Sequence, residues 1–161
     1  MSNIISFGNN DICMSNGTTD VFINLIALNG SELAKTESEK QLIVWISEKD
    51  QKTVGMGTVS FDMSEMIWNR ETFLNDRAFL VKVTENAEKG FCWEKLDYTP
   101  NKEIILPVLE KFKEMLLSMT EKDIKDEELQ EWLKEKTELD FPRCQKHNTL
   151  LTFCGCQVCN N

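Results

Sequence analysis

Hydrophobic and polar positions change their spacing near residue 62, and this change divides most of the chain into two predicted regions. Before it, apolar residues come in short runs at 21–28, 41–47 and 53–61, rich in β-branched and aromatic side chains. Runs of this length and composition are typical of strands. The pattern therefore predicts that residues 1–62 form mainly strands.

Polar segments separate these predicted strands. The connection 48–52 favours an antiparallel hairpin between the second and third runs. Gly55 and Gly57 weaken the third strand and indicate a bulge or a close approach of a ligand to the backbone. Residues 8–17 have the composition of an irregular loop, and residues 31–39 that of a short helical turn or a connection.

After residue 62, apolar residues recur every three or four positions, as they do in amphipathic helices. The spacing predicts helices over residues 71–89, 104–119 and 121–140, with Gly90 ending the first of them. Residues 78–83 could equally be a buried strand. Pro107 has no backbone donor, so the second helix either bends there or begins near it, and the preceding apolar pair favours a bend.

The third predicted helix is strongly acidic. Residues 121–140 carry nine acidic and four basic side chains, a net charge of −5. Trp132 and Leu133 are expected to pack this helix on the rest of the protein while its acids face water. Pro142 is expected to end it, because the residue before a proline is driven out of the helical conformation.

Candidate chemistry is concentrated near the carboxyl terminus. Cys144-x2-His147 and Cys156-x2-Cys159 are two ligand pairs separated by eight residues, and His147 is the one histidine in the chain. Two intervening residues let a tight turn direct both side chains at one ion, and a small hairpin over 148–155 would bring the pairs together. This arrangement resembles the zinc-knuckle and zinc-ribbon motifs over residues 144–159. The resemblance implies one tetrahedral Zn²⁺ ion.

Cys154 is a fifth candidate ligand. It could replace His147 in a four-thiolate site, or it could stand outside the metal shell as a packed thiol. The short separation of Cys154 from Cys156 favours Cys156 with Cys159 as the second ligand pair. A shell of four protein ligands leaves no position for water or substrate, so the zinc is expected to be structural.

Enzyme motifs that would use such a metal are missing from the sequence. There is no His-Glu-x-x-His helix and no His-x-Glu paired with Pro-Cys-x-x-Cys. A catalytic triad would have only His147 as its base, and the metal would occupy that side chain. Cys13 and Cys92 are expected to be small buried residues. A redox or metal-dependent enzyme that uses the C-terminal cysteines remains the alternative.

Charge and composition narrow the class of partner. The 161 residues carry a net charge of −9, with 41% hydrophobic and 28% charged residues, which is within the globular range. Lysines and arginines are scattered, so binding to nucleic acid is not expected. An acidic surface could attract another protein, particularly a basic one.

The start of the chain lacks the basic and apolar segments of a secretory signal, and its longest apolar run is too short to span a bilayer. We therefore expect a cytoplasmic protein without membrane contact, in which clustered thiols hold metal more often than they form disulfides.

Together these patterns predict an α+β fold in one domain, residues 1–161. Strands dominate 1–62 and form an antiparallel sheet, two or three helices from 63–140 pack on it, and 141–161 form a metal-binding tail with a zinc knuckle. The expected function is non-catalytic protein–protein binding by a small acidic zinc protein. An inhibitor or immunity-type protein that uses the acidic helix is one concrete version.

Overall fold

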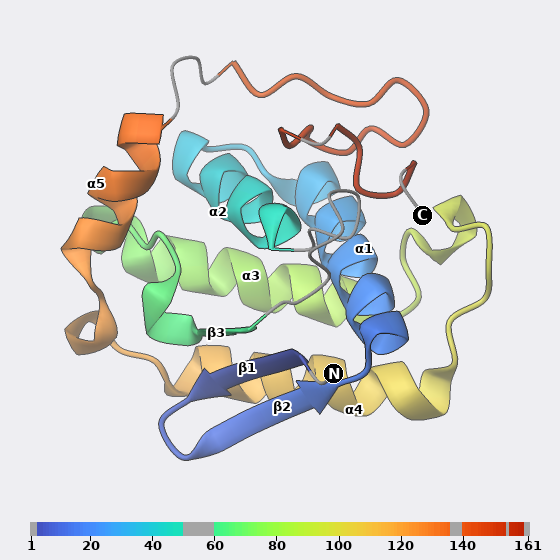
Figure 1. The fold of residues 1–161 in the computed structure, drawn as a ribbon, viewed down its shortest axis with the longest axis horizontal. Coiled ribbons are helices and arrows are strands. Elements are labelled where there is room, and N and C mark those ends of the chain that lie inside the picture. Colours follow the sequence, from blue (N-terminus) through green and yellow to red (C-terminus); the bar gives the residue numbers. More distant parts are fainter. Residues whose placement is uncertain (1–2, 50–59, 136–139, 154, 160–161) are drawn as a thin grey trace.

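The computed structural model describes residues 3–49, 60–135, 140–153 and 155–159, and within them the fold is α+β (Figure 1). A three-stranded sheet and five α-helices are present in these ranges. Their order is β1 (Asn3–Phe7), β2 (Asn10–Met14), α1 (Asn16–Leu33), α2 (Glu37–Glu48), β3 (Ser60–Asp62), α3 (Phe73–Glu88), α4 (Lys102–Ser118) and α5 (Asp126–Glu135). Short 3-10 turns lie between them at η2 (Met63–Glu65), η3 (Arg70–Thr72), η4 (Trp93–Lys95) and η5 (Glu121–Asp123).

The sheet is mixed, with the strand order β2-β1-β3. β1 pairs with β2 in antiparallel orientation and with β3 in parallel orientation, so the prediction of a purely antiparallel sheet is wrong. Gly8 and Asn9 connect β1 to β2, and Gly8 has a φ of 61°, which glycine adopts without strain. The predicted loop over residues 8–17 is therefore a hairpin turn, a strand and the beginning of α1.

The first two predicted strands are helices. Residues 21–28 lie in α1 and residues 41–47 in α2, so the predicted hairpin between the second and third runs is also wrong. Ser15 caps α1 by accepting a hydrogen bond from the Thr18 amide, and α2 begins with a capping box at Thr36. The apolar runs 21–28 and 41–47 are almost completely buried. Neither helical segment therefore shows the alternation of apolar and polar faces that would mark it as a helix in the sequence. The end of α1 and the start of α2 also account for most of the polar segment 31–39. Of the third predicted strand, residues 53–59 lie outside the described residues, and its last two residues begin β3.

The helices predicted in the second half are confirmed, although their boundaries differ. α3 occupies most of 71–89 and ends at Glu88, and Gly90, with a φ of 91°, follows its Lys89 cap at the position predicted to stop the helix. The Phe91 amide donates to the Asn86 carbonyl and the Gly90 amide to the Ala87 carbonyl, which together form a Schellman motif. α4 begins after its Asn101 cap and continues through Pro107. Fold class is therefore correct at the level of α+β, but the helices are more numerous than predicted.

The acidic segment forms η5 and α5, while residues 136–139 lie outside the described residues. Trp132 is buried, and Leu129 and Leu133 pack against the hydrophobic core beside it. The expected attachment of this helix through Trp132 and Leu133 is thereby confirmed.

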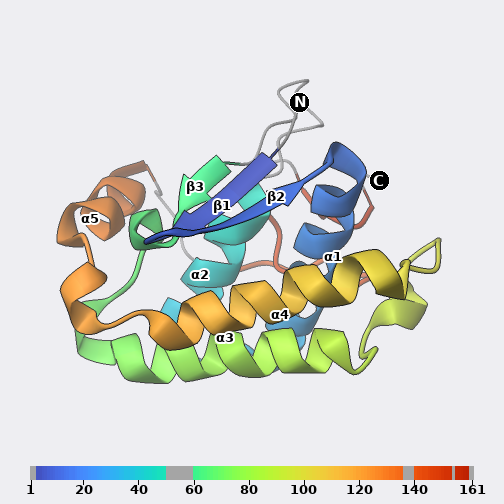
Figure 2. The same ribbon diagram turned by 90° about the horizontal axis from the view of Figure 1, so that it is seen from below.

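The helices pack beneath the sheet and beside one another (Figure 2). α3 and α4 run side by side, and α1 contacts α2, α3 and α4. Phe22 of α1 meets Phe112 of α4 edge to face, with ring centroids 5.1 Å apart. Trp68, the largest fully buried side chain in the described part of the chain, packs on Phe73. No described helix has both the length and the apolar character that a membrane span requires.

α1 and α2 are in close contact at Gly30. A Cβ atom at this position would overlap the Ile43 side chain of α2. Ile43 is fully buried and β-branched, so it has little freedom to rotate away. Gly30 is therefore required by packing rather than by backbone conformation.

We expect Gly30→Ala to destabilise the protein by about 1–3 kcal/mol, as overpacking of a filled core does. The matched control is Gly17→Ala in the same helix, where an added Cβ meets only the Ser15 hydroxyl at 4.0 Å. Alanine there is expected to be neutral or stabilising by up to about 1 kcal/mol. Urea unfolding of both variants measures the difference, and equal stabilities would contradict the proposed packing role of Gly30.

Candidate metal centre

The C-terminal tail crosses the end of α1, on the side of the molecule away from the sheet (Figure 1). Ser31 in the last turn of α1 binds the tail twice. Its carbonyl accepts a hydrogen bond from Arg143 Nη1 at 2.7 Å, and its hydroxyl accepts one from the Leu150 amide at 2.9 Å. Leu150 is only 1% exposed. The tail is therefore held on the body by both polar and apolar contacts.

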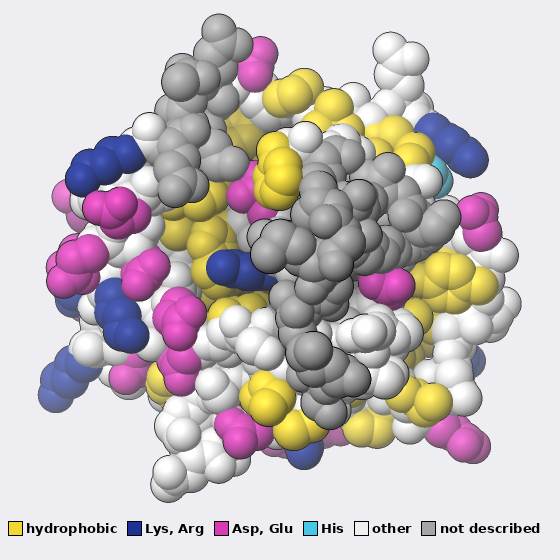
Figure 3. Space-filling model, in the orientation of Figure 1, with side chains coloured by type: hydrophobic (Ala, Val, Ile, Leu, Met, Phe, Trp, Pro, Cys, Tyr) yellow, Lys and Arg dark blue, Asp and Glu magenta, His cyan; other side chains and the backbone are white. Residues whose placement is uncertain are grey.

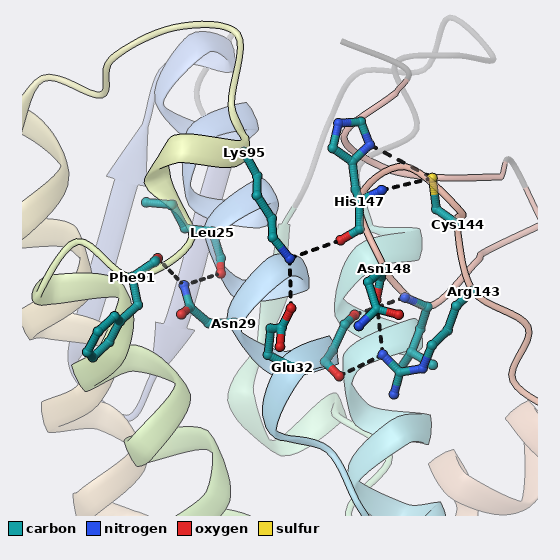
Figure 4. A network of polar contacts seen from close by, with 11 residues as sticks. Leu25, Asn29, Glu32, Phe91, Lys95, Arg143, Cys144, His147 and Asn148 are labelled. Carbon is teal, nitrogen blue, oxygen red and sulfur yellow. Dashed lines mark hydrogen bonds and ion pairs between the residues drawn. The ribbon is translucent and has the colours of Figure 1, made fainter.

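A polar network extends this attachment (Figure 4). Lys95 Nζ donates to Glu32 at 2.7 Å and to the His147 carbonyl at 3.4 Å, and so joins η4, α1 and the tail. The hydrogen bond from Lys95 is the main cause that lowers the pKa of Glu32, and Asn148 and Arg143 of the tail add to it while burial opposes it. These contacts fix the backbone of the first ligand pair.

The two ligand pairs form turns of the same kind. The His147 amide donates to the Cys144 sulfur at 3.4 Å, and the Cys159 amide donates to the Cys156 sulfur at 3.4 Å. The Asn148 amide also donates to the Cys144 carbonyl at 2.9 Å. In each turn the two intervening residues bring both side chains to the same side, as the spacing predicts.

The four side chains converge on one point. Their ligand atoms all lie within 4.8 Å of one another, and this is the one such group in the described part of the chain. The distance between Cys144 Sγ and Cys159 Sγ is 3.7 Å. His147 Nδ1 lies 3.8 Å from Cys144 Sγ, 3.5 Å from Cys156 Sγ and 3.3 Å from Cys159 Sγ.

These distances match the edges of a zinc tetrahedron. Zn–S bonds of about 2.3 Å and a Zn–N bond of about 2.0–2.1 Å place two sulfurs about 3.8 Å apart and a sulfur about 3.6 Å from the nitrogen. A disulfide would require a separation of about 2.05 Å between sulfurs. The cluster can therefore hold a metal ion such as zinc.

Hydrogen bonding and proximity make the thiols unequal. Burial raises the pKa of Cys144, but amide hydrogen bonds from His147 and Lys146 outweigh it and lower this pKa to about 6. Burial and the hydrogen bonds with Cys144 and Cys156 raise the pKa of Cys159 to about 11. The protein alone thus favours one thiolate and resists another, whereas a divalent cation would stabilise all three.

Burial protects part of the cluster from solvent. His147 is 5% exposed and Cys156 is 7% exposed, whereas Cys159 is at the surface. The buried Thr149 hydroxyl lies 2.9 Å from Cys156 Sγ, where it can donate to a thiolate. Such outer contacts orient metal ligands and support their charge.

The remaining residues of the tail and the two isolated cysteines differ in burial. Leu150 packs inward and Leu151 partly so, whereas Phe153 is 64% exposed. Cys154 lies outside the described residues. Cys92 is buried as expected, whereas Cys13 is exposed on β2.

Ser31, Lys95 and Thr149 support the site but carried no signal at the sequence level. Ser31 lies in a segment with the composition of a polar connection, and Lys95 is separated from the tail by some fifty residues. Their roles follow only from the tertiary structure. Comparisons with protein-family models, with curated proteins and with solved structures give no significant match.

We expect the purified protein to bind one zinc ion per chain. Loss of a group that contacts a metal ligand typically weakens metal binding by about 10–100-fold, and Cys156→Ser, which removes a ligand itself, should weaken zinc binding by more than this. Cys13→Ser is the matched control, because Cys13 is an exposed thiol far from the cluster in the sequence. Elemental analysis measures the stoichiometry, and Co²⁺ titration monitored by thiolate-to-metal absorption measures the affinity.

The same titration distinguishes the two ligand sets. His147→Ala should weaken Co²⁺ binding and Cys154→Ser should leave it unchanged if three thiolates and the imidazole form the shell. The opposite result would establish four thiolates, and unchanged binding in every variant would exclude this cluster as the metal site.

Proposed function

We propose that the chain is a small acidic zinc-binding protein in which Cys144, His147, Cys156 and Cys159 hold one structural Zn²⁺ ion. The single observation that carries this proposal is the convergence of three sulfurs and one imidazole nitrogen, all within 4.8 Å of one another. Four protein donors complete a zinc shell, whereas catalytic zinc sites keep one position open for water or substrate.

The surroundings of the site support a structural ion. His147 is the one histidine in the chain, so its use as a ligand leaves no second imidazole to act as a general base. Leu150 and Val158 beside the ligand turns are buried, and Ser31 fixes the tail by two hydrogen bonds. The ion would link the two ligand turns of the tail, and the rest of the tail contacts the body of the protein.

We further propose that the protein acts without catalysis, by binding another protein through α5. α5 contains five acidic residues and one basic residue, Lys134, so its net charge is −4. Leu129, Trp132 and Leu133 pack on the core, while Asp126, Glu127 and Glu131 are exposed. Figure 3 shows charged side chains gathered over this part of the surface, on the left. A basic protein, for example the target of an inhibitor or immunity-type protein, has the complementary charge.

Redox chemistry at the tail is the second candidate function. It is favoured by the exposure of Cys159 and by the pKa of about 6 at Cys144, because a thiolate is the reactive form of cysteine. In that case the metal-free Cys156 and Cys159 thiols would pass two electrons and two protons to a disulfide of another molecule, which would be reduced to two thiols while Cys156 and Cys159 form a disulfide.

Removal of zinc by a chelator is expected to release the tail while leaving the helical body folded. Amides of residues 143–159 should lose protection in hydrogen exchange, whereas those of α3 and α4 should keep it, because tertiary packing rather than the tail covers them. Backbone circular dichroism should change little. Global unfolding on chelation would contradict a role confined to the tail.

Thiol reactivity separates the two candidate functions in the same preparation. The zinc-bound cysteines should resist alkylation until the chelator is added. Rapid alkylation of the zinc-loaded protein, with reversible formation of a Cys156–Cys159 disulfide, would support the redox alternative.

Charge reversal tests the proposed partner surface. Replacing Glu127, Glu128 and Glu131 by lysine should weaken binding to a protein that copurifies with the wild type by at least about tenfold at low salt, since close charge pairs govern such complexes. The matched control reverses three exposed acids on other elements, with the same change in net charge: Glu94, Glu110 and Glu114. Equal affinities of the two triple variants would reject α5 as the contact.

A further inference from the structure

The four ligand side chains of the candidate metal centre differ in their exposure to solvent. His147 and Cys156 are 5% and 7% exposed, whereas Cys144 is partly exposed and Cys159 lies at the surface. Two ligands therefore face the interior of the protein, and the line that joins Cys144 Sγ to Cys159 Sγ is the solvent-facing edge of the cluster. A small reagent in solution meets this edge before it meets Cys156.

Cys156 is held in place as well as shielded. The Thr149 hydroxyl, which is fully buried, lies 2.9 Å from Cys156 Sγ, and the Cys159 amide donates to the same sulfur at 3.4 Å. Hydrogen bonds stabilise the negative charge of a thiolate and reduce its tendency to attack another atom. Burial and hydrogen bonding therefore both protect Cys156 from oxidation.

Cys159 has the opposite environment. Its side chain is exposed, and its sulfur lies 3.3 Å from His147 Nδ1 and 3.7 Å from Cys144 Sγ. The susceptibility of a cysteine to oxidation follows its thiolate character and its exposure. A bound divalent cation would keep Cys159 in the thiolate form, and its place at the surface supplies the exposure. Cys159 is therefore expected to be oxidised first.

Cys144 is the thiolate best placed to react with an oxidised Cys159. The two sulfurs are 3.7 Å apart, and a disulfide requires about 2.05 Å, so a displacement of less than about 2 Å joins them. Cys144 is also partly exposed, so it can follow Cys159 toward solvent. Movement of Cys156 would instead break its contact with Thr149. The structure thus favours the pair Cys144 and Cys159, although Cys156 is nearer to Cys159 in the sequence.

Hydrogen peroxide is an oxidant small enough to use this edge. The Cys159 thiolate attacks one oxygen of the peroxide, the O–O bond breaks, and hydroxide leaves as a sulfenic acid forms. The Cys144 thiolate then attacks the Cys159 sulfur, the S–S bond forms, and a second hydroxide leaves. The two sulfurs together lose two electrons, which the two peroxide oxygens gain, and two protons from solvent convert the hydroxides to water.

On the basis of the zinc site put forward above, we propose that Cys144 and Cys159 are an oxidation-sensitive pair, which peroxide converts to a disulfide with expulsion of Zn²⁺ while Cys156 stays reduced. The ion loses two of its four ligands, because a disulfide has no thiolate to offer, and His147 with Cys156 cannot complete the shell. The disulfide then links the two ligand turns in place of the ion. The hydrogen bonds of Ser31 to the tail do not involve these sulfurs and remain.

This reaction differs from the redox alternative described above, in which the metal-free Cys156 and Cys159 thiols pass electrons to another molecule. Here the zinc-loaded protein is the reactant, and the cluster responds to an oxidant. Zinc withdraws electron density from the sulfurs that it binds, so their oxidation is slower than that of a free thiolate and requires an excess of peroxide. The same effect accounts for the expected resistance of the zinc-bound cysteines to alkylation.

The test treats the zinc-loaded full-length protein with an excess of hydrogen peroxide, which catalase then removes. Elemental analysis after gel filtration measures the zinc retained, and mass spectrometry of unreduced peptides identifies the disulfide. Zinc should be lost together with formation of the Cys144–Cys159 disulfide, and dithiothreitol with added Zn²⁺ should restore the metal content. Retained zinc, or a main product that contains Cys156 or Cys154, would overturn the proposal.

The zinc content before peroxide is added separates this proposal from the proposed function. A folded protein purified without zinc, and unable to take it up, would reject the zinc site and the oxidation-sensitive pair together. A zinc-loaded protein that keeps its ion in peroxide would reject the pair alone.

Two variants test whether oxidation begins at Cys159. Cys159→His replaces the exposed thiolate by an imidazole, which zinc also accepts, and should retain zinc but slow its loss in peroxide by at least about tenfold, because the remaining thiolates are less exposed. Cys13→Ser is the matched control, since Cys13 is an exposed thiol on β2, and it should leave the rate of zinc loss unchanged. Equal rates for Cys159→His and the wild type would show that oxidation begins at another residue. If Cys159→His does not hold zinc, the disulfide found in the wild type decides.

Discussion

The last turn of α1 is the structural constraint on which the arrangement of this protein depends. Three consecutive residues there contact three different parts of the chain. Gly30 allows α2 to approach, Ser31 accepts two hydrogen bonds from the tail, and Glu32 pairs with Lys95 of η4. Because these contacts share one rigid turn, the position of the candidate metal centre follows from the packing of α1 against α2.

The errors at the sequence level have a common physical cause. Phe22, Ile26 and Leu28 are at most 1% exposed, so α1 has no continuous polar face and its apolar run is indistinguishable from a buried strand. The first strands were missed for the opposite reason, since they are short and partly polar. A signal was present in the Gly8-Asn9 pair, which is typical of a two-residue hairpin turn. Amphipathic α3 and α4, which expose one face, were predicted correctly.

The candidate site was easier to predict than the fold because its geometry is local. Each ligand pair is held by a turn of four residues, and the amide-to-sulfur bonds within Cys144–His147 and Cys156–Cys159 follow directly from that spacing. The body that receives the tail could not be inferred in this way. Ser31 lies more than a hundred residues before Arg143, and its two acceptor groups become meaningful only when α1 and the tail meet.

The proposed closed metal shell would restrict where function lies. Four donors would complete the coordination of zinc and leave the ion no vacant position, so specificity would come from surfaces that the folded chain presents. Under the proposed function, the acids of α5 would attract a basic partner from a distance and raise the rate of encounter, whereas the affinity of the complex would depend on closer contacts around this helix.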